Sequence, residues 1–145
     1  MRVVVQRVDT ASVRIDGRSA GEIGLGLLVL VGFAPSDDEA SLAWMAEKIR
    51  GLRIFADQSG RMNLDVAAAG GSLLVVSQFT LYGDAAKGRR PSFSAAAAPE
   101  VAERLYNRFL ELCEGHGVSV ACGEFGAMMD VELVNSGPVT LVIER

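Results

Sequence analysis

The sequence has 145 residues, half of them hydrophobic, and its formal net charge is −4. Domains cluster near this length, and such a chain can bury a core without disulfides or a metal, so we expect one domain spanning residues 1–145. The acidic balance argues against broad, nonspecific binding to nucleic acid, because proteins that bind phosphate backbones in this way are usually basic over their contact surface.

The start of the chain and its cysteines indicate where the protein works. Residues 1–7 lack the apolar stretch and cleavage site of a signal peptide. The longest apolar run, residues 25–33, is about half of the ~20 residues that a membrane span needs. Cys113 and Cys122 have neither metal nor redox spacing, which indicates free thiols in a reducing compartment. We therefore expect a soluble, cytoplasmic protein with no membrane contact.

Runs of β-branched and apolar residues predict strands through the first part of the chain. Residues 3–8 form one such run. Residues 12–15 alternate between apolar and polar side chains, and Asp16-Gly17 then favours a tight hairpin into a segment that ends at Ile23. Residues 27–31 are continuously apolar, which predicts a central strand covered on both faces.

Two amphipathic helices are expected further along. Residues 36–39 have the spacing of a capping box, and apolar residues then recur with the helical period, which predicts a helix from about Asp37 to Arg53. Pro99 suits the first turn of a second helix, which ends before Gly115. Further strands are expected at residues 72–79, 129–134 and 139–143. The sum is one α/β domain, mostly β-sheet, with two amphipathic helices.

Familiar catalytic motifs are missing from the sequence. The single histidine, His116, lies between glycines just past the expected end of a helix, where a cation favours the helix dipole. A Ser-His-Asp or Cys-His arrangement therefore has little support, and no metal or nucleotide motif has a usable context. An enzyme built from this sequence is expected to work without a histidine base, without a bound metal and without a cofactor.

A polar segment follows the apolar residues 73–76 although the strand is expected to continue. In Ser77-Gln78-Phe79-Thr80, period-two alternation places Gln78 and Thr80 on one face and Ser77 and Phe79 on the other. Polar groups at the carboxyl end of a strand often have a ligand as their partner. The alternative is that these residues only end the strand and satisfy a turn.

A second segment, residues 135–140, lies between the two last expected strands and contains Gly137-Pro138. Gly and Pro in sequence normally make a turn. An X-Pro bond can also be cis at a cost of about 0.5–1 kcal/mol, and a cis bond would direct two carbonyl oxygens to one side of a rigid loop. Such a loop is suited to testing the handedness of an α-amino group, but the residues alone do not fix the isomer.

These two segments resemble the signatures of the D-aminoacyl-tRNA deacylase family. The family patterns are Ser-Gln-x-x-Leu, here residues 77–81, and Asn-x-Gly-Pro-x-Thr, here residues 135–140. The resemblance extends along the whole chain and includes residues 4–8, 52–55, 62–64, 87–93 and 125–127. One position departs from it, because family members commonly have Asp where this chain has Met128, a change that bears on contacts near the terminal adenosine.

The resemblance implies a function and an assembly. Proteins of this family hydrolyse the ester that joins a D-amino acid, or achiral glycine, to the 3′ end of tRNA, as carboxylic ester hydrolases. They are homodimers with a mostly β-sheet, barrel-like core and a site at the subunit interface. Gly137-Pro138 is then expected to be a cis dipeptide that reaches into the partner's site and rejects L-amino acids by exclusion.

The resemblance also implies roles for individual residues. The catalytic segment is Ser77, Gln78, Phe79 and Thr80, and backbone N–H groups near Phe79 and Thr80 are our candidates for an oxyanion hole. We expect Thr80 to orient substrate or water, since no base is visible that would activate it as a nucleophile. Phe125 and Met129 are expected to pack on the terminal adenine, and Lys87, Arg89 and Arg90 to meet acceptor-end phosphates, although a solvated basic loop is the simpler reading.

Three other interpretations remain open on the sequence alone. A noncatalytic module would use the same residues to hold a tRNA end without hydrolysing it. A general small-ester hydrolase would not need tRNA, but the sequence offers few acid–base residues for it. A purely structural dimer would leave the polar interruption at Ser77-Gln78 without a purpose.

Overall fold

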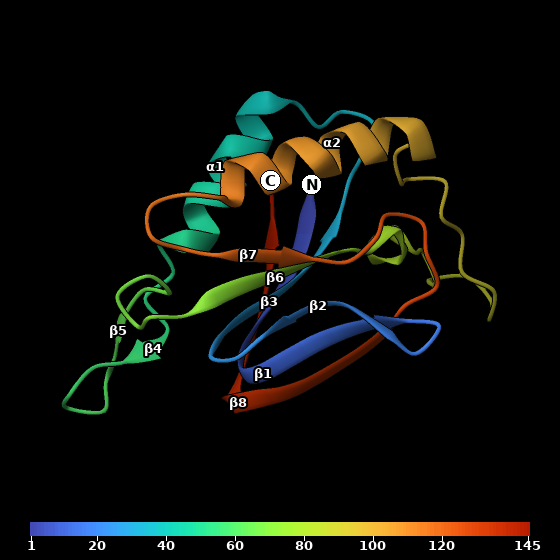
Figure 1. Ribbon diagram of the computed structural model, residues 1–145. Coiled ribbons are helices and arrows are strands. Elements are labelled where there is room, and N and C mark those ends of the chain that lie inside the picture. The colour runs from blue at the N-terminus through green and yellow to red at the C-terminus, as the bar shows by residue number, and fades with distance from the viewer.

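The computed structural model describes all 145 residues and has two helices lying side by side over one face of a curved β-sheet (Figure 1). The main sheet contains β1 (Arg2–Ile15), β2 (Arg18–Ile23), β3 (Gly26–Gly32), β6 (Ser72–Ser77), β7 (Val120–Cys122) and β8 (Asp130–Glu144). A separate hairpin of β4 (Phe55–Ala56) and β5 (Met62–Leu64) projects from the body. The helices are α1 (Glu39–Arg50) and α2 (Pro99–Cys113), and a short 3₁₀ helix, η1, spans Phe79–Tyr82.

The sheet curls into a nearly closed barrel, as expected. Its order is β2-β1-β3-β6-β7, with β8 paired antiparallel to β1. β3, β6 and β7 are parallel to one another, whereas β1 is antiparallel to β2 and β3. The two ends of this order come close, because a methyl group at Gly21 of β2 would lie 2.7 Å from the carbonyl oxygen of Cys122 in β7.

The central strands are buried on both faces, which confirms the prediction for residues 27–31. Alternate residues of β3 and β6, such as Val29 and Val75, join a core of 21 residues that lies between the sheet and the helices. The residues between them, Leu28 and Leu74, point to the other face and join a second core of 7 residues inside the barrel. The two cores together fix the carboxyl ends of β3 and β6.

Both predicted helices are present, but the first is shorter at both ends than the sequence predicted. The N-cap is Asp38, whose carboxylate accepts a hydrogen bond from the backbone N–H of Ser41, and that bond lowers the pKa of the carboxyl group. The helix therefore spans Glu39–Arg50 and not Asp37 to Arg53, and Ser36 takes no part in the cap. Pro99 is the first residue of α2, as its position predicted.

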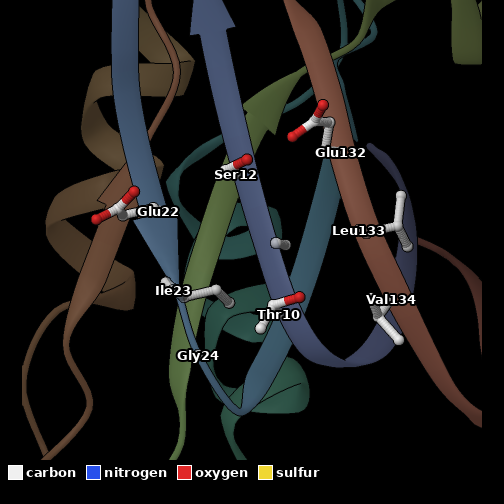
Figure 2. Close-up of a pocket in the computed structure, with 9 residues that line it drawn as sticks. Thr10, Ser12, Glu22, Ile23, Gly24, Glu132, Leu133 and Val134 are labelled. Carbon is white, nitrogen blue, oxygen red and sulfur yellow. The ribbon is translucent and has the colours of Figure 1, made fainter.

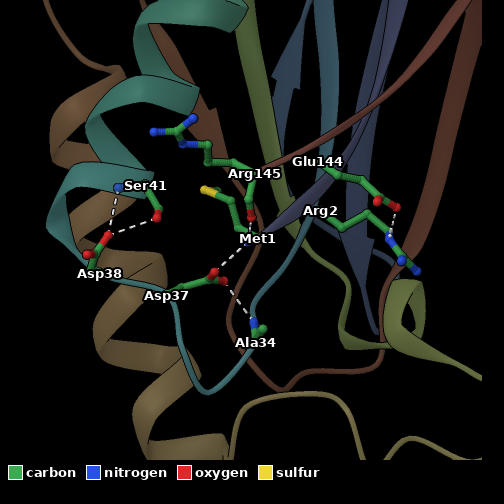
Figure 3. A network of polar contacts seen from close by, with 8 residues as sticks. All are labelled: Met1, Arg2, Ala34, Asp37, Asp38, Ser41, Glu144 and Arg145. Atoms are coloured by element: carbon green, nitrogen blue, oxygen red, sulfur yellow. Dashed lines mark hydrogen bonds and ion pairs between the residues drawn. The ribbon is translucent and has the colours of Figure 1, made fainter.

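Asp37 forms an ion pair with the N-terminus of the chain and does not belong to α1 (Figure 3). Its carboxylate pairs with the α-amino group of Met1 at 2.5 Å and accepts a hydrogen bond from the backbone N–H of Ala34. The same amino group donates to the carbonyl oxygen of Arg145 at 2.7 Å, and the neighbouring Arg2 pairs with Glu144. These contacts join the start of β1, the end of β8 and the loop before α1.

The last third of the chain contains one long strand where two were expected. β8 runs from Asp130 to Glu144 without a break, so the predicted turn at residues 135–140 is wrong. The ladder between β1 and β8 is irregular here: Val8 pairs with Asn135 but Gln6 pairs with Thr140. β8 therefore has more residues than β1 between these two pairs, and they bulge out of the ladder. Pro138 is accommodated because β8 lies at the edge of the sheet.

Cys113 and Cys122 are free thiols, as expected, and Cys113 is fully buried in α2. No helix of the structure is both long and apolar enough to cross a membrane.

Burial raises the pKa of the Cys113 thiol to about 12, which predicts a loss of stability in alkaline solution. An unfolded chain releases this proton near pH 8.5, so burial of the neutral thiol contributes fully only below that pH. Above it, the free energy of unfolding should fall by up to about 1.4 kcal/mol per pH unit for this group. Urea unfolding between pH 8 and 10.5 should show a shallower decline for Cys113→Ala; equal slopes would contradict the assignment.

Candidate active site

A cavity of about 780 Å³ opens at the carboxyl ends of β3 and β6. Of its 20 lining residues, 14 are hydrophobic and none carries an ionisable side chain. Four elements build the wall: the end of β3, residues 76–80, the loop and first turn of α2 at residues 93–102, and residues 125–131. Polar groups in this cavity are therefore hydroxyls, amides and the backbone itself.

The first signature segment enters the cavity as a turn and not as a strand. The backbone N–H of Gln78 donates to the carbonyl oxygen of Val31 at 2.7 Å, and η1 begins at the next residue. The predicted alternation of residues 77–80 between two faces is therefore wrong beyond Ser77. The turn packs closely on Gly32, where a methyl group would lie 2.8 Å from the carbonyl oxygen of Gln78.

Side-chain contacts hold this turn together. The side-chain amide of Gln78 donates a hydrogen bond to the hydroxyl of Thr80. The Phe79 ring packs edge-on against Phe93, with the ring centroids 5.1 Å apart. Thr80 is exposed, and Phe79 is 57% exposed although it is a large apolar residue. The first N–H groups of a helical turn have no acceptor within it, and no side chain accepts a bond from the N–H of Phe79 or Thr80.

Phe125 and Met129 also line this cavity. The Phe125 ring packs against Tyr106 of α2 with the ring centroids 5.9 Å apart. The thioether sulfur of Met129 lies so close to Gly123 that a methyl group there would be 2.6 Å from it. Met128 also lines the cavity, and its side chain is 90% exposed.

Gly137 and Pro138 are absent from this cavity, and the bond between them is cis. Gly137 has φ of +109°, and its Cα faces the guanidinium of Arg7 so closely that a methyl group would clash with it. Arg7 donates hydrogen bonds to the carbonyl oxygens of Ser136 and Ile54, which ties this part of β8 to the segment before β4.

The two signature segments are far apart within one chain. Ser77 pairs with Val31, which pairs with Val3, so three strand spacings separate it from β8. Gly137 lies beside Arg7, about four residues farther along β1. With about 4.8 Å between strands and 3.4 Å per residue, the path along the sheet surface is on the order of 20 Å.

Sequence reasoning gave no role to Arg2 and Arg7, which both turn out to hold signature segments. The Arg2 guanidinium donates to the carbonyl oxygen of Leu81 in η1 at 2.5 Å and lies over the Tyr82 ring. Burial is the main cause that raises the pKa of the Tyr82 hydroxyl. Arg7 belongs to the resemblance at residues 4–8, but the partners of both arginines are distant in sequence, so the neighbouring residues do not indicate these contacts.

Other candidate residues lie outside the cavity. His116 borders a groove at the ends of the two helices, together with Arg50 and Glu47. Lys87, Arg89 and Arg90 are exposed in the loop before α2, whose base is closed by pairing between Asp84 and Ser92.

A second open groove lies on the strand surface of β1, β2 and β8 (Figure 2). Thr10, Ser12 and the carboxylates of Glu22 and Glu132 border it. No group of three or more histidine, cysteine or acidic side chains in the structure is arranged to hold a metal ion. This groove lacks the enclosed apolar wall of the cavity at Ser77, so the cavity is the better candidate site.

A family model described as D-Tyr-tRNA(Tyr) deacylase matches residues 4–144. The chain belongs to this family. A D-aminoacyl-tRNA deacylase of Desulfatibacillum aliphaticivorans is 57% identical over 99% of both chains. The protein of the same name from Pelobacter propionicus is 56% identical over the full length of both.

Two solved structures share the fold of this chain. One described as c-Myc DNA Unwinding Element Binding Protein is 40% identical, with a TM-score of 0.94 over 100% of this chain and 99% of the other. A structure described as a probable eukaryotic D-amino acid tRNA deacylase is 20% identical and has a TM-score of 0.80 over 98% of this chain and 97% of its own, which shows a shared fold.

Proposed function

We propose that the protein hydrolyses the ester bond between a D-amino acid and the 3′ end of tRNA, releasing the free D-amino acid and tRNA. The observation that carries this is the turn at residues 77–80, which lines a cavity without ionisable side chains and whose N–H groups at Phe79 and Thr80 have no hydrogen-bond acceptor in the protein. The relatives named D-aminoacyl-tRNA deacylase support the substrate. Residues 1–145 act as one domain in this proposal.

Catalysis at this turn rests on position and polarity. An aminoacyl ester is already reactive, and the ribose carries a neighbouring 2′-hydroxyl, so correct placement can supply much of the acceleration. The N–H groups of Phe79 and Thr80 stabilise the oxyanion, a contribution worth about 2.7–4 kcal/mol for a single donor. The Thr80 hydroxyl, held by the Gln78 amide, orients the substrate, because no side chain of the cavity wall is a base.

Rejection of L-amino acids is assigned to Gly137 and Pro138 of a second subunit. Neither residue lines the cavity of its own chain, and the path along the sheet to Ser77 is on the order of 20 Å, which argues that they serve another copy's cavity. The exposed apolar residues Val134 and Val142 of β8 favour burial of this strand face in a homodimer. The role is exclusion of the wrong enantiomer by shape.

The remaining tRNA contacts follow from the cavity wall and the basic loop. Phe125 and Met129 pack on the terminal adenine, since aromatic contact is the common way to hold an unpaired base. Lys87, Arg89 and Arg90 meet acceptor-end phosphates, which gives an acidic protein a local surface for RNA. Glycine attached to tRNA is a further substrate, because exclusion by handedness does not act on an achiral residue.

The deciding experiment compares hydrolysis of D-Tyr-tRNA and L-Tyr-tRNA by the purified protein. We expect release of D-tyrosine at a rate at least about 100-fold above that of L-tyrosine, the effect of about 2.7 kcal/mol between enantiomers. Equal rates on both would refute the function. A D-Tyr-tRNA that is bound but stays esterified would indicate a noncatalytic binding module. Comparable turnover of simple aryl esters without tRNA would indicate a general esterase.

A further inference from the structure

The side chain of Tyr106 carries a polar group into the core between α2 and the sheet. The residue is 2% exposed, and its hydroxyl lies 2.9 Å from the carbonyl oxygen of Val75 and 3.3 Å from that of Gly123. Burial raises the pKa of this hydroxyl far above its ordinary value, so it stays a hydrogen-bond donor. A phenylalanine would fill the same space, so the hydroxyl itself requires an explanation.

The two carbonyl groups that meet Tyr106 belong to the frame of the cavity. Val75 lies in β6, two residues before Ser77, and its carbonyl oxygen also accepts a bond from the backbone N–H of Gly123 at 3.1 Å. Gly123 directly follows β7 and begins the segment of residues 123–129. The Tyr106 hydroxyl thus fastens the start of this segment to the strand that leads into the catalytic turn.

The rest of the segment depends on the same anchor. The Tyr106 ring packs against Phe125, and Gly123 lies in close contact with the sulfur of Met129. Phe125 and Met129 both line the cavity. A shift of Gly123 would therefore move both of them.

We propose that Tyr106 is a positioning residue for the part of the site that receives the terminal adenine. Its hydroxyl fixes Gly123 and its ring fixes Phe125, so that residues 123–129 are preorganised before the substrate arrives. Tyr106 does not touch the substrate, and the inference rests on the proposed function of this cavity.

The test compares wild type with Tyr106→Phe, which keeps the ring and removes the hydroxyl. We expect KM for a D-tyrosyl minihelix to rise about 5- to 20-fold with kcat changed less than about twofold. The reason is that more mobile residues 123–129 bind the terminal adenine less tightly, whereas the turn at residues 77–80 is unaltered. The effect should disappear on a minihelix whose 3′-terminal nucleotide lacks its base. It should also be less than additive with Phe125→Ala, because both changes act on one wall.

Cys113→Ala is the matched control, since Cys113 is buried in the same helix, two turns after Tyr106, but does not line the cavity. It should lower thermal stability and leave KM unchanged. An unchanged KM in Tyr106→Phe, or an equal rise on the minihelix without the terminal base, would overturn the role of Tyr106. A wild-type protein that is inactive on the intact D-tyrosyl minihelix would overturn the proposed function instead.

Discussion

Replacing Phe79 by proline will lower kcat for D-Tyr-tRNA by about 10²–10³ relative to Phe79→Ala, the loss found when one oxyanion donor is removed. Both variants lack the aromatic ring, so their ratio isolates the backbone N–H. Proline is tolerated here because Phe79 is the first residue of η1, where the missing N–H has no acceptor within the turn. Single-turnover kinetics with saturating enzyme would measure the difference.

Two results would contradict this prediction. Equal activity of the proline and alanine variants would show that the N–H of Phe79 has no part in catalysis. An acyl-enzyme on Thr80, trapped by acid quench in the wild type and absent in Thr80→Ala, would make Thr80 a nucleophile and not an orienting group. We expect Thr80→Ala to keep measurable hydrolysis, with no trapped intermediate.

Replacing Gly137 by alanine will let the enzyme hydrolyse L-Tyr-tRNA. The residue has φ of +109°, and the added methyl group would press on the Arg7 guanidinium, so the dipeptide must leave its place. We expect the ratio of D to L rates to fall by about 10- to 100-fold, which corresponds to about 1.4–2.7 kcal/mol. The rate on D-Tyr-tRNA should change much less, since residues 77–80 are untouched.

Gly17→Ala provides a control that also places a side chain at a position of positive φ. Gly17 has φ of +77° but nothing within 4 Å of an added methyl group, so the D to L ratio should remain that of the wild type. Mixed dimers test the assignment to the partner subunit. In a dimer of wild type with a Phe79→Pro/Gly137→Ala chain, the one intact cavity faces the altered Gly137. It should accept L-Tyr-tRNA, and retained discrimination would place the dipeptide in its own chain's site.

The sequence predicted those parts of the fold that depend on local chemistry. The apolar run at residues 27–31 became the doubly buried β3, and Pro99 began α2. The hairpin at Asp16-Gly17 also formed, with both residues at positive φ. These features follow from the hydrophobicity and backbone preferences of neighbouring residues, so a short window of the sequence is enough to predict them.

The wrong predictions concern features that depend on contacts between residues distant in sequence. β6 ends at Ser77, and the backbone N–H of Gln78 then makes the last hydrogen bond of this strand to β3. Its acceptor, the carbonyl oxygen of Val31, lies 47 positions earlier in the chain. Asp37, the predicted first residue of α1, lies before the helix and pairs with the amino group of Met1. The turn expected at Gly137-Pro138 is an irregularity inside β8, which only the pairing with β1 defines. Partners of this kind leave no periodic pattern in the sequence.

The candidate site was predictable only where the resemblance supplied it. Phe125 and Met129 line the same cavity as Ser77–Thr80, but periodicity gave no reason to bring these segments together. Arg7 and Tyr106 were not found, since their importance depends on carbonyl groups that any residue would present. Their roles become visible only with coordinates.

The cavity wall without ionisable side chains has a consequence for inhibition. A charged drug-like molecule would find no counter-ion there, and a reactive warhead would find no thiol or lysine to capture. Selective compounds for this cavity should instead combine a flat aromatic group for the face at Phe125 with a neutral tetrahedral centre that accepts hydrogen bonds from η1. Their affinity would come from shape and main-chain donors, so single side-chain substitutions would offer few routes to resistance.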